Sequence, residues 1–453
     1  MFSQDLTPED PAPGTTGRYI VLFSEENGGR SGADALSDTA GLSAISTADF
    51  EEGAVEGERL ESLEAVVFDE LSVAVVDAAP SQAQALSAAT TQEESPILAV
   101  EPERVVYALL PERFGDSLTP APNPLSTTAG PSPEFLRGYR EAVSHLVGRV
   151  LGDGGASGAA TEEVAATAFD ESEFTWGLQA TKSSASRFSG RGVRVAVLDT
   201  GLDLQHPDFQ RRSITSRSFI MGEEVQDGHG HGTHCIGTAC GPRQPGQSPR
   251  YGIAYTSEIF VGKVLSNRGS GTDGGILAGI NWAISNGCRV ISMSLGAATR
   301  PGQGFSPIFE AVARRALAAG TLIIAAAGNE SNRPQVVAPV GHPANCPSIM
   351  AVAALDAQGQ VAFFSCGSVN HPGGGVDIAG PGVSVRSSWP RPIVYRAING
   401  TSMATPHVAG IAALHAEANP GVRGRALGQV LFESARRQTL LSTDVGVGLV
   451  QAP

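Results

Sequence analysis

The sequence lacks any apolar run of the roughly 18 to 20 residues that a membrane-spanning helix needs. Residues 1–14 are polar and rich in proline, and they lack the basic start and apolar core of a secretory signal. We therefore expect no membrane span. The compartment stays open, because the protein is either cytoplasmic or exported by a signal that this sequence does not contain.

Positive charge is also scarce. The chain has 31 Lys and Arg residues against 46 Asp and Glu residues, which gives a net charge of −15. Nucleic acids and anionic lipids repel a protein of this sign. The balance therefore argues against nucleic acid or a membrane surface as the main partner.

Cysteine is rare and confined to the second half of the chain. The five cysteines are Cys235, Cys240, Cys288, Cys346 and Cys366. Their odd number leaves at least one thiol unpaired, and no Cys-x-x-Cys spacing indicates a zinc site. We expect buried thiols with at most one or two disulfides.

The length of 453 residues and a hydrophobic content of 41% predict two folded units and a linker. The first unit spans 18–109. Its order of elements, β-α-β-β-α-β, predicts a small α+β domain of the ferredoxin-like type, an antiparallel sheet with both helices on one face. Its strands are expected at 19–23, 65–68, 72–76 and 97–107, its helices at 33–42 and 81–89, and a solvated acidic loop at 49–64.

The middle segment, 110–172, is rich in Pro, Gly, Ser, Thr and Ala, which is typical of a linker. Apolar residues at helical spacing over 133–151 predict one amphipathic helix inside it.

The last segment, 173–453, alternates short apolar runs with helix-length stretches. This pattern predicts an α/β domain with a mostly parallel, doubly wound sheet covered on both faces. In such sheets, catalytic and binding residues lie just beyond the carboxyl ends of the strands. The expected strands are at 194–198, 259–264, 289–294, 322–326 and 349–353.

Four polar residues stand at a strand end or a helix start. Asp199 ends an apolar strand, His231 precedes a helix of small residues, Asn329 follows a strand, and Ser402 opens a helix. A hydroxyl at a helix start lies near unpaired N–H groups and the positive end of the helix dipole. Each residue alone is explained as a turn or cap, but the four together suit nucleophilic catalysis, in which a histidine activates a serine.

A second interpretation uses three histidines. His229, His231 and His234 have the His-x-His-x-x-His spacing of some metal-dependent hydrolases. Metallo-β-lactamase-type enzymes carry an aspartate just before the last histidine, where this chain has Thr233, and no later His or Asp partners stand at obvious ligand positions. A metal-dependent hydrolase stays open as a remote alternative.

The sequence resembles the subtilisin-like serine proteases, or subtilases, over about residues 175–450. The motifs that carry the resemblance are Val-Leu-Asp-Thr-Gly at Asp199, His-Gly-Thr-His at His231, Ala-Ala-Gly-Asn at Asn329 and Gly-Thr-Ser-Met-Ala-Thr-Pro-His at Ser402. The resemblance implies a serine endopeptidase that uses a Ser402, His231 and Asp199 triad and an acyl-enzyme intermediate. Asn329 would donate a hydrogen bond to the oxyanion, and the catalytic site would hold no metal and require no cofactor.

The resemblance also implies how a polypeptide substrate binds. One segment would pair with the substrate backbone as an added strand, and another would form the opposite edge of the cleft. An open apolar pocket implies broad specificity for large uncharged residues at the position just before the cleaved bond. The backbone segments are Ser294, Leu295 and Gly296 on one side and Gly269, Ser270 and Gly271 on the other, while Gly341, Ala326 and Gly328 would form the base and wall of the pocket.

Residues 18–109 resemble the inhibitory propeptide of subtilases, which assists folding and blocks the cleft with its own tail. This implies a monomeric, self-inhibited zymogen, exported as subtilases commonly are, with Leu109 at the usual end of the tail. Because a long segment follows Leu109, we expect cleavage anywhere between Leu109 and Phe174.

Two further points stay open. Asp208 resembles one ligand of the family's structural calcium site, but the loop expected to supply the others, 241–250, has no carboxylate. The chain could also be a catalytically idle relative that only binds peptides, although the complete set of four residues argues against this.

Overall fold

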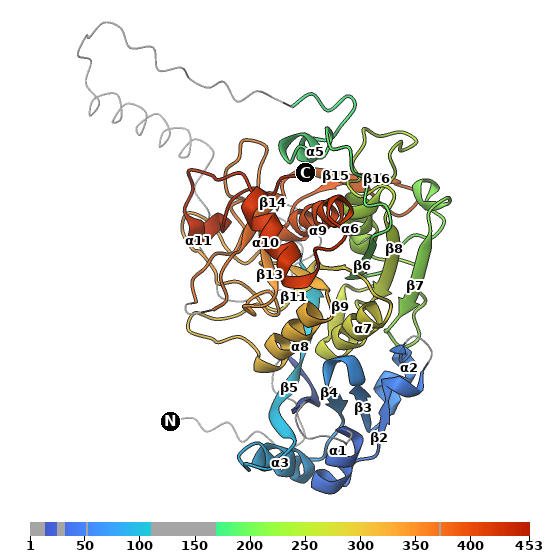
Figure 1. The fold of residues 1–453 in the computed structure, drawn as a ribbon, viewed down its shortest axis with the longest axis vertical. Coiled ribbons are helices and arrows are strands. Elements are labelled where there is room, and N and C mark those ends of the chain that lie inside the picture. The colour runs from blue at the N-terminus through green and yellow to red at the C-terminus, as the bar shows by residue number, and fades with distance from the viewer. Residues whose placement is uncertain (1–13, 25–31, 51–52, 110–168, 371–372) are drawn as a thin grey trace, which may run out of the picture. The chain divides into compact units, whose positions relative to one another are not determined.

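The structure is a computed structural model that describes residues 14–24, 32–50, 53–109, 169–370 and 373–453 (Figure 1). All of them belong to one compact unit formed from Met1–Pro111 and Ala168–Pro453. The predicted linker lies outside the described residues apart from 169–172, and so does its predicted helix over 133–151. Among the described residues, no helix is both long enough and apolar enough to cross a membrane.

The N-terminal part is a mixed sheet with helices. Its strands follow the order β5-β1-β4-β3-β2, and all neighbours are antiparallel except β2 and β3. The elements are β1 (Thr15–Phe23), α1 (Gly32–Ala40), β2 (Ala44–Ser46), β3 (Ala65–Phe68), β4 (Val73–Val76), α3 (Pro80–Ala89) and β5 (Ile97–Ala108). Strand β2 was not predicted, because three residues are too short to show a period.

The acidic stretch 49–64 is not simply a solvated loop, as the sequence suggested. It holds the end of a 3₁₀ turn, η1 (Thr47–Asp49), and a short helix, α2 (Gly57–Ser62). Val55 and Leu60 are buried and anchor the stretch against the core. The burial of these apolar side chains holds the stretch against the core despite its acidic residues.

Both faces of the N-terminal sheet are buried. Along β1, Val21 and Phe23 face a cluster with Leu36 of α1, whereas Ile20 and Leu22 belong to the large core of the rest of the chain. Successive side chains of a strand point to opposite faces, which explains the alternation. The 3₁₀ turn η3 (Asp69–Leu71) packs on α7 and α8, so this sheet rests on helices of the larger part (Figure 1).

The larger part is built on a seven-stranded sheet of order β14-β13-β12-β10-β6-β8-β7. Every neighbouring pair is parallel. All residues of β10, β12 and β13 are buried, as expected for parallel strands that are covered on both faces. The strands are β6 (Arg194–Asp199), β7 (Ile214–Ser218), β8 (Glu258–Lys263), β10 (Val290–Met293), β12 (Leu322–Ala326), β13 (Met350–Leu355) and β14 (Ile378–Pro381).

Helices cover this sheet. Helices α6 and α9 pack on each other, α9 crosses β10, β12, β13 and β14, and α7 and α8 pack on β6 and β12 respectively. The helices are α5 (Trp176–Ala180), α6 (His231–Cys240), α7 (Asp273–Ser285), α8 (Pro307–Ala318), α9 (Thr401–Ala418), α10 (Gly424–Ser434) and α11 (Ser442–Val445), with a 3₁₀ turn η4 (Pro207–Phe209). The cysteines are all buried and free, so none forms a disulfide.

One strand joins the two parts. The first half of β5 pairs with β1, and its second half pairs antiparallel with two short strands of the larger part, β9 (Ser270–Thr272) and β11 (Leu295–Gly296). A separate hairpin is formed by β15 (Val385–Ser388) and β16 (Tyr395–Ile398). The end of β5 therefore reaches the edge of the parallel sheet where chemistry is expected.

Candidate active site

The fold brings Asp199, His231 and Ser402 together at the carboxyl end of the parallel sheet. Asp199 is the last residue of β6, His231 the first residue of α6, and Ser402 lies in the first turn of α9. All three are fully buried. Neighbouring parallel strands end at the same edge, which is why residues far apart in the sequence meet there.

Asp199 and His231 form a buried pair. The distance between His231 Nδ1 and Asp199 Oδ1 is 2.7 Å. Burial acts against the charged imidazolium, but the Asp199 carboxylate outweighs it and holds the pKa of His231 well above its ordinary value. Nε2 of His231 has no hydrogen-bond partner among the described residues, so the second ring nitrogen is not engaged by protein.

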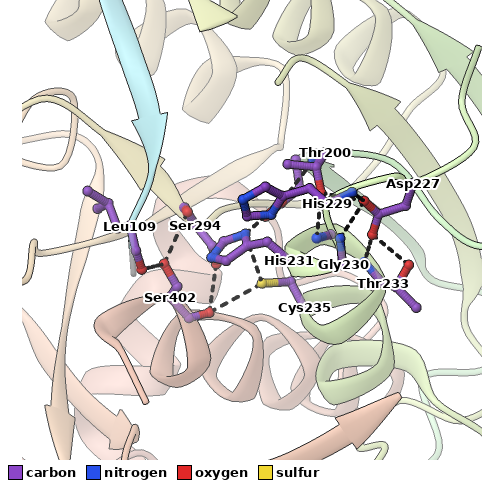
Figure 2. A network of polar contacts seen from close by, with 12 residues as sticks. Leu109, Thr200, Asp227, His229, Gly230, His231, Thr233, Cys235, Ser294 and Ser402 are labelled. Carbon is purple, nitrogen blue, oxygen red and sulfur yellow. Dashed lines mark hydrogen bonds and ion pairs between the residues drawn. The ribbon is translucent and has the colours of Figure 1, made fainter. Parts of the chain in front are cut away.

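The Ser402 hydroxyl does not bond to His231 in this state. Its Oγ lies 2.6 Å from the carbonyl oxygen of Leu109 and 3.1 Å from that of Ser294. A hydroxyl has one proton to donate, so the shorter contact to Leu109 takes it. Figure 2 shows Leu109 at the end of β5 reaching Ser402, with the His231 ring beside them.

Asn329 meets the same carbonyl group. Its Nδ2 donates to Leu109 O at 2.9 Å. Its Oδ1 accepts hydrogen bonds of 2.9 Å from both N and Oγ1 of Thr401, which fixes the amide with its N–H groups turned toward Leu109. The Leu109 carbonyl oxygen therefore receives two donors, one from Ser402 and one from Asn329.

The strand β5 occupies the cleft as an added strand. Ala108 and Tyr107 pair with Leu295 and Gly296 of β11 on one side. On the other side, Tyr107 pairs with Ser270 of β9. The two segments expected to pair with a substrate backbone thus pair with this chain's own β5.

Two further backbone bonds seat the tip of β5. The amide of Ala108 donates to Gly269 O at 2.8 Å, and that of Leu109 donates to Ser294 O at 3.4 Å. A Cβ added to Gly296 would stand 3.6 Å from Leu109 Cδ1 and only 2.4 Å from the carbonyl oxygen of His342. Gly296 is therefore a position where the backbone needs close approach.

A carboxylate that the sequence did not reveal organises the start of α6. Asp227 Oδ2 accepts from Thr233 N at 2.9 Å, and Oδ1 accepts from Thr200 Oγ1 at 2.9 Å (Figure 2). Oδ1 also accepts from the backbone amides of His229 and Gly230. An aspartate shortly before a helix is a recognisable capping signal, and here it fixes the turn that carries His231.

The three histidines do not gather around one point. His234 lies on α6 with its Nε2 2.9 Å from Val385 O, and burial lowers the pKa of His234 to about 3. Burial also lowers the pKa of His229, whose ring is 6.2 Å from that of His231 between centroids. Within the described ranges, the donor atoms that lie close enough for one ion belong to Asp199, His231 and Cys235 instead.

The profile of the subtilase family matches residues 190–448, more than half of the chain. The chain belongs to the subtilase family. It is 38% identical to subtilisin Savinase of Lederbergia lenta over 61% of this chain and 96% of the relative, and 41% identical to a subtilisin of Bacillus pumilus over 51% and 80%. The crystal structure of a cold adapted subtilisin-like serine proteinase matches with a TM-score of 0.53 and 31% identity, covering 62% of this chain and 99% of that chain. The protein is a subtilisin-like serine peptidase.

In this subtilase, the residues expected to form a side-chain pocket lie close to Asn329. A Cβ on Gly328 would meet the Glu330 carboxylate at 2.5 Å and Cys366 Sγ at 2.9 Å. The amide of Gly341 donates to Ala327 O at 2.9 Å, next to the buried Ala326. Their roles in a pocket stay a prediction.

Cys235 is a buried neighbour of the catalytic candidates. Its Sγ lies 3.9 Å from His231 Nδ1 and 3.5 Å from Ser402 O. Burial raises the pKa of Cys235 to about 11, so the thiol stays protonated at neutral pH and packs as a small apolar group.

The surroundings of Asp208 do not fit the family's calcium ion. Its Oδ2 accepts from Tyr251 Oη at 2.6 Å and Tyr395 Oη at 3.0 Å, and its Oδ1 accepts from Gly246 N at 3.2 Å. Burial and the nearby carboxylate raise the pKa of Tyr251, which keeps that hydroxyl a donor. A calcium site needs several oxygen ligands facing the ion, whereas N–H and O–H donors face this carboxylate.

We predict that a chelator leaves the melting temperature of the Ser402→Ala chain unchanged, because donors already satisfy Asp208. Tyr251→Phe removes one of the three donors to this half-buried carboxylate and should cost about 1.5–3 kcal/mol of unfolding free energy, the scale of a hydrogen bond to a charged group. Thermal and denaturant unfolding with and without EGTA measure both effects. A large drop with EGTA, together with an unchanged Tyr251→Phe variant, would contradict this account of Asp208.

Proposed function

We propose that this subtilase is a serine endopeptidase made as a self-inhibited zymogen. Ser402 acts as nucleophile, His231 as general base and acid, Asp199 as the group that orients His231, and Asn329 as an oxyanion donor. The observation that carries the proposal is the Leu109 carbonyl, which lies between Ser402 Oγ and Asn329 Nδ2 at the end of a strand paired like a bound peptide. We infer that Leu109–Leu110 is the bond that the enzyme cuts first.

The first chemical step is attack on this carbonyl. Ser402 Oγ forms a bond to the carbonyl carbon while its proton passes to Nε2 of His231, which no other described group engages and which must be neutral to accept it. The imidazolium that forms is stabilised by Asp199, whose Oδ1 lies 2.7 Å from Nδ1. To start the step, the hydroxyl turns from Leu109 O toward the ring, a rearrangement consistent with catalytic hydrogen bonds that tighten only during reaction.

The negative charge of the tetrahedral intermediate falls on the carbonyl oxygen. Asn329 Nδ2 already lies 2.9 Å from it, and the backbone N–H of Ser402 at the start of α9 is the expected second donor. The C–N bond then breaks as His231 returns its proton to the leaving amine, which leaves an acyl group on Ser402. Water repeats the sequence and releases the carboxylate product.

The N-terminal part acts as the inhibitor in this proposal. While β5 is paired with β9 and β11, Ser402 is fully buried and a second polypeptide has no access to it. The side chain before the bond is leucine, which is consistent with broad specificity for large uncharged residues at that position. Polypeptides are thus the expected substrates, and the chain's own N-terminal part is its first partner.

A fluorophosphonate probe tests the proposed nucleophile. The probe should label Ser402 slowly in the intact chain and rapidly after the N-terminal part is removed, and EGTA should have no effect. Ser402→Ala should abolish labelling, while Ser442→Ala, which changes an exposed serine of α11, should retain it. An unlabelled processed protein that still binds peptides would instead identify an idle relative.

The oxyanion role of Asn329 predicts a specific kinetic loss. Asn329→Ala should lower kcat by about 10²- to 10³-fold, the range found on removing such a donor in subtilisin, with a much smaller change in KM. Asn286→Ala, at the far end of α7, is the matched control. A variant with normal kcat and raised KM would assign Asn329 to ground-state binding.

A further inference from the structure

We propose that Asp273 recognises a positively charged side chain at the sixth position before the cleaved bond. Favoured polypeptide substrates would then carry Arg or Lys at that position. The proposal rests on the proposed peptidase function and deepens it, because it adds a subsite to the same cleft.

The position follows from the pairing of β5. The carbonyl held by Ser402 and Asn329 belongs to Leu109, so Leu109 is the first residue before the bond and Arg104 is the sixth. Val105 and Val106 pair with Thr272 and Gly271 of β9, which keeps the strand in register up to the start of α7. Arg104 therefore arrives beside the residue that follows β9, Asp273.

Asp273 holds Arg104 at two points. Its Oδ2 accepts from the Arg104 backbone N at 3.1 Å and from Nη1 at 3.2 Å. Its Oδ1 lies 3.0 Å from Nε2 of His342. The backbone contact is open to any residue except proline, whereas the side-chain contact selects a cation.

Burial makes this contact sensitive to charge. The Asp273 side chain is 0% exposed and that of His342 is 4% exposed, while that of Arg104 is 25% exposed. A buried carboxylate without a cation costs free energy, and a second carboxylate beside it would add repulsion. An Arg at the sixth position of a substrate compensates the negative charge of Asp273, whereas a Glu at that position is repelled by it.

Arg104 has a second partner, which belongs to the N-terminal part. Its Nη2 donates to Glu101 Oε2 at 2.8 Å, and Glu101 Oε1 accepts from Ser306 Oγ at 2.9 Å. This carboxylate leaves with β5, but Asp273 stays with the peptidase. A substrate peptide that lacks the equivalent of Glu101 therefore isolates the contribution of Asp273.

The test uses the enzyme that forms when the full-length chain processes itself. Its substrates are acetylated peptides copied from residues 104–113, with Arg, Lys, Gln or Glu at the first residue. The acetyl group keeps the amide N–H that donates to Asp273. We expect kcat/KM for the Arg peptide to exceed that for the Glu peptide about tenfold, the scale of a hydrogen bond to a charged group. The difference should lie in KM, because the contact is made equally in the bound substrate and in the transition state.

Variants assign the preference to one carboxylate. Asp273→Asn should bring the ratio of kcat/KM for the Arg peptide to that for the Glu peptide close to one. High salt should lower the same ratio in part, because partly exposed charges are screened. Glu433→Gln, which makes the same change in net charge at an exposed site on α10, should keep the ratio. Equal cleavage of all four peptides by the unaltered enzyme would overturn the proposal while leaving the peptidase function intact.

A second measurement needs no catalysis. In the full-length Ser402→Ala chain, hydrogen exchange of the amides of residues 104–109 reports how tightly the strand is held. Asp273→Asn and Arg104→Gln should each speed this exchange several-fold, Arg104→Lys less, and β12 should not change. Unchanged hydrogen exchange in Asp273→Asn would overturn the proposal about Asp273. Failure of the enzyme to cut any of the peptides would instead refute the peptidase function, and the exchange measurement would still test Asp273.

Discussion

The hydrogen bonds to the Leu109 carbonyl oxygen are the contacts on which the rest of the structure depends. Ser402 and Asn329 can both reach this oxygen only if α9 begins, and β12 ends, at the same edge of the parallel sheet. The carbonyl can be there only if β5 runs between β9 and β11. The hydrogen bonds of the Leu109 carbonyl thus require one relative arrangement of the parallel sheet, the N-terminal sheet and the site.

Charges at helix starts support the same arrangement. Asp227 accepts from the amides of His229 and Gly230 before α6 and of Thr233 in its first turn, and so fixes the turn that carries His231. Glu103 accepts from the amide of Gly274 at the start of α7, and Arg18 compensates its buried charge. Carboxylates are stabilised at helix N-termini by unpaired N–H groups. The N-terminal part is therefore held to the peptidase by buried polar contacts as well as by apolar packing.

Much of this was predictable from the sequence. Apolar runs such as 194–198 and 322–326 predicted buried parallel strands, because each run is too short for a helix and has no polar face. The four motifs indicated the family, and the family profile confirms that identification. The positions of Asp199 and Asn329 follow from the rule for strand ends, whereas His231 and Ser402 stand at helix starts.

Other features were beyond the sequence for physical reasons. Strand β2 and helix α2 are too short to show a period, and their burial depends on tertiary contacts. The contact of Arg104 with Asp273 joins residues 169 positions apart, and no local pattern reports which side chains lie opposite across a cleft. The state of Ser402, bonded to Leu109 and not to His231, depends on the strand that fills the site.

The most direct test of the account is the mass of the fragments formed when purified full-length chain processes itself. We predict an N-terminal fragment whose last residue is Leu109, and no such fragment from the Ser402→Ala chain. A fragment that ends elsewhere, or the same cut in Ser402→Ala, would contradict the claim that β5 lies in the cleft as the first substrate.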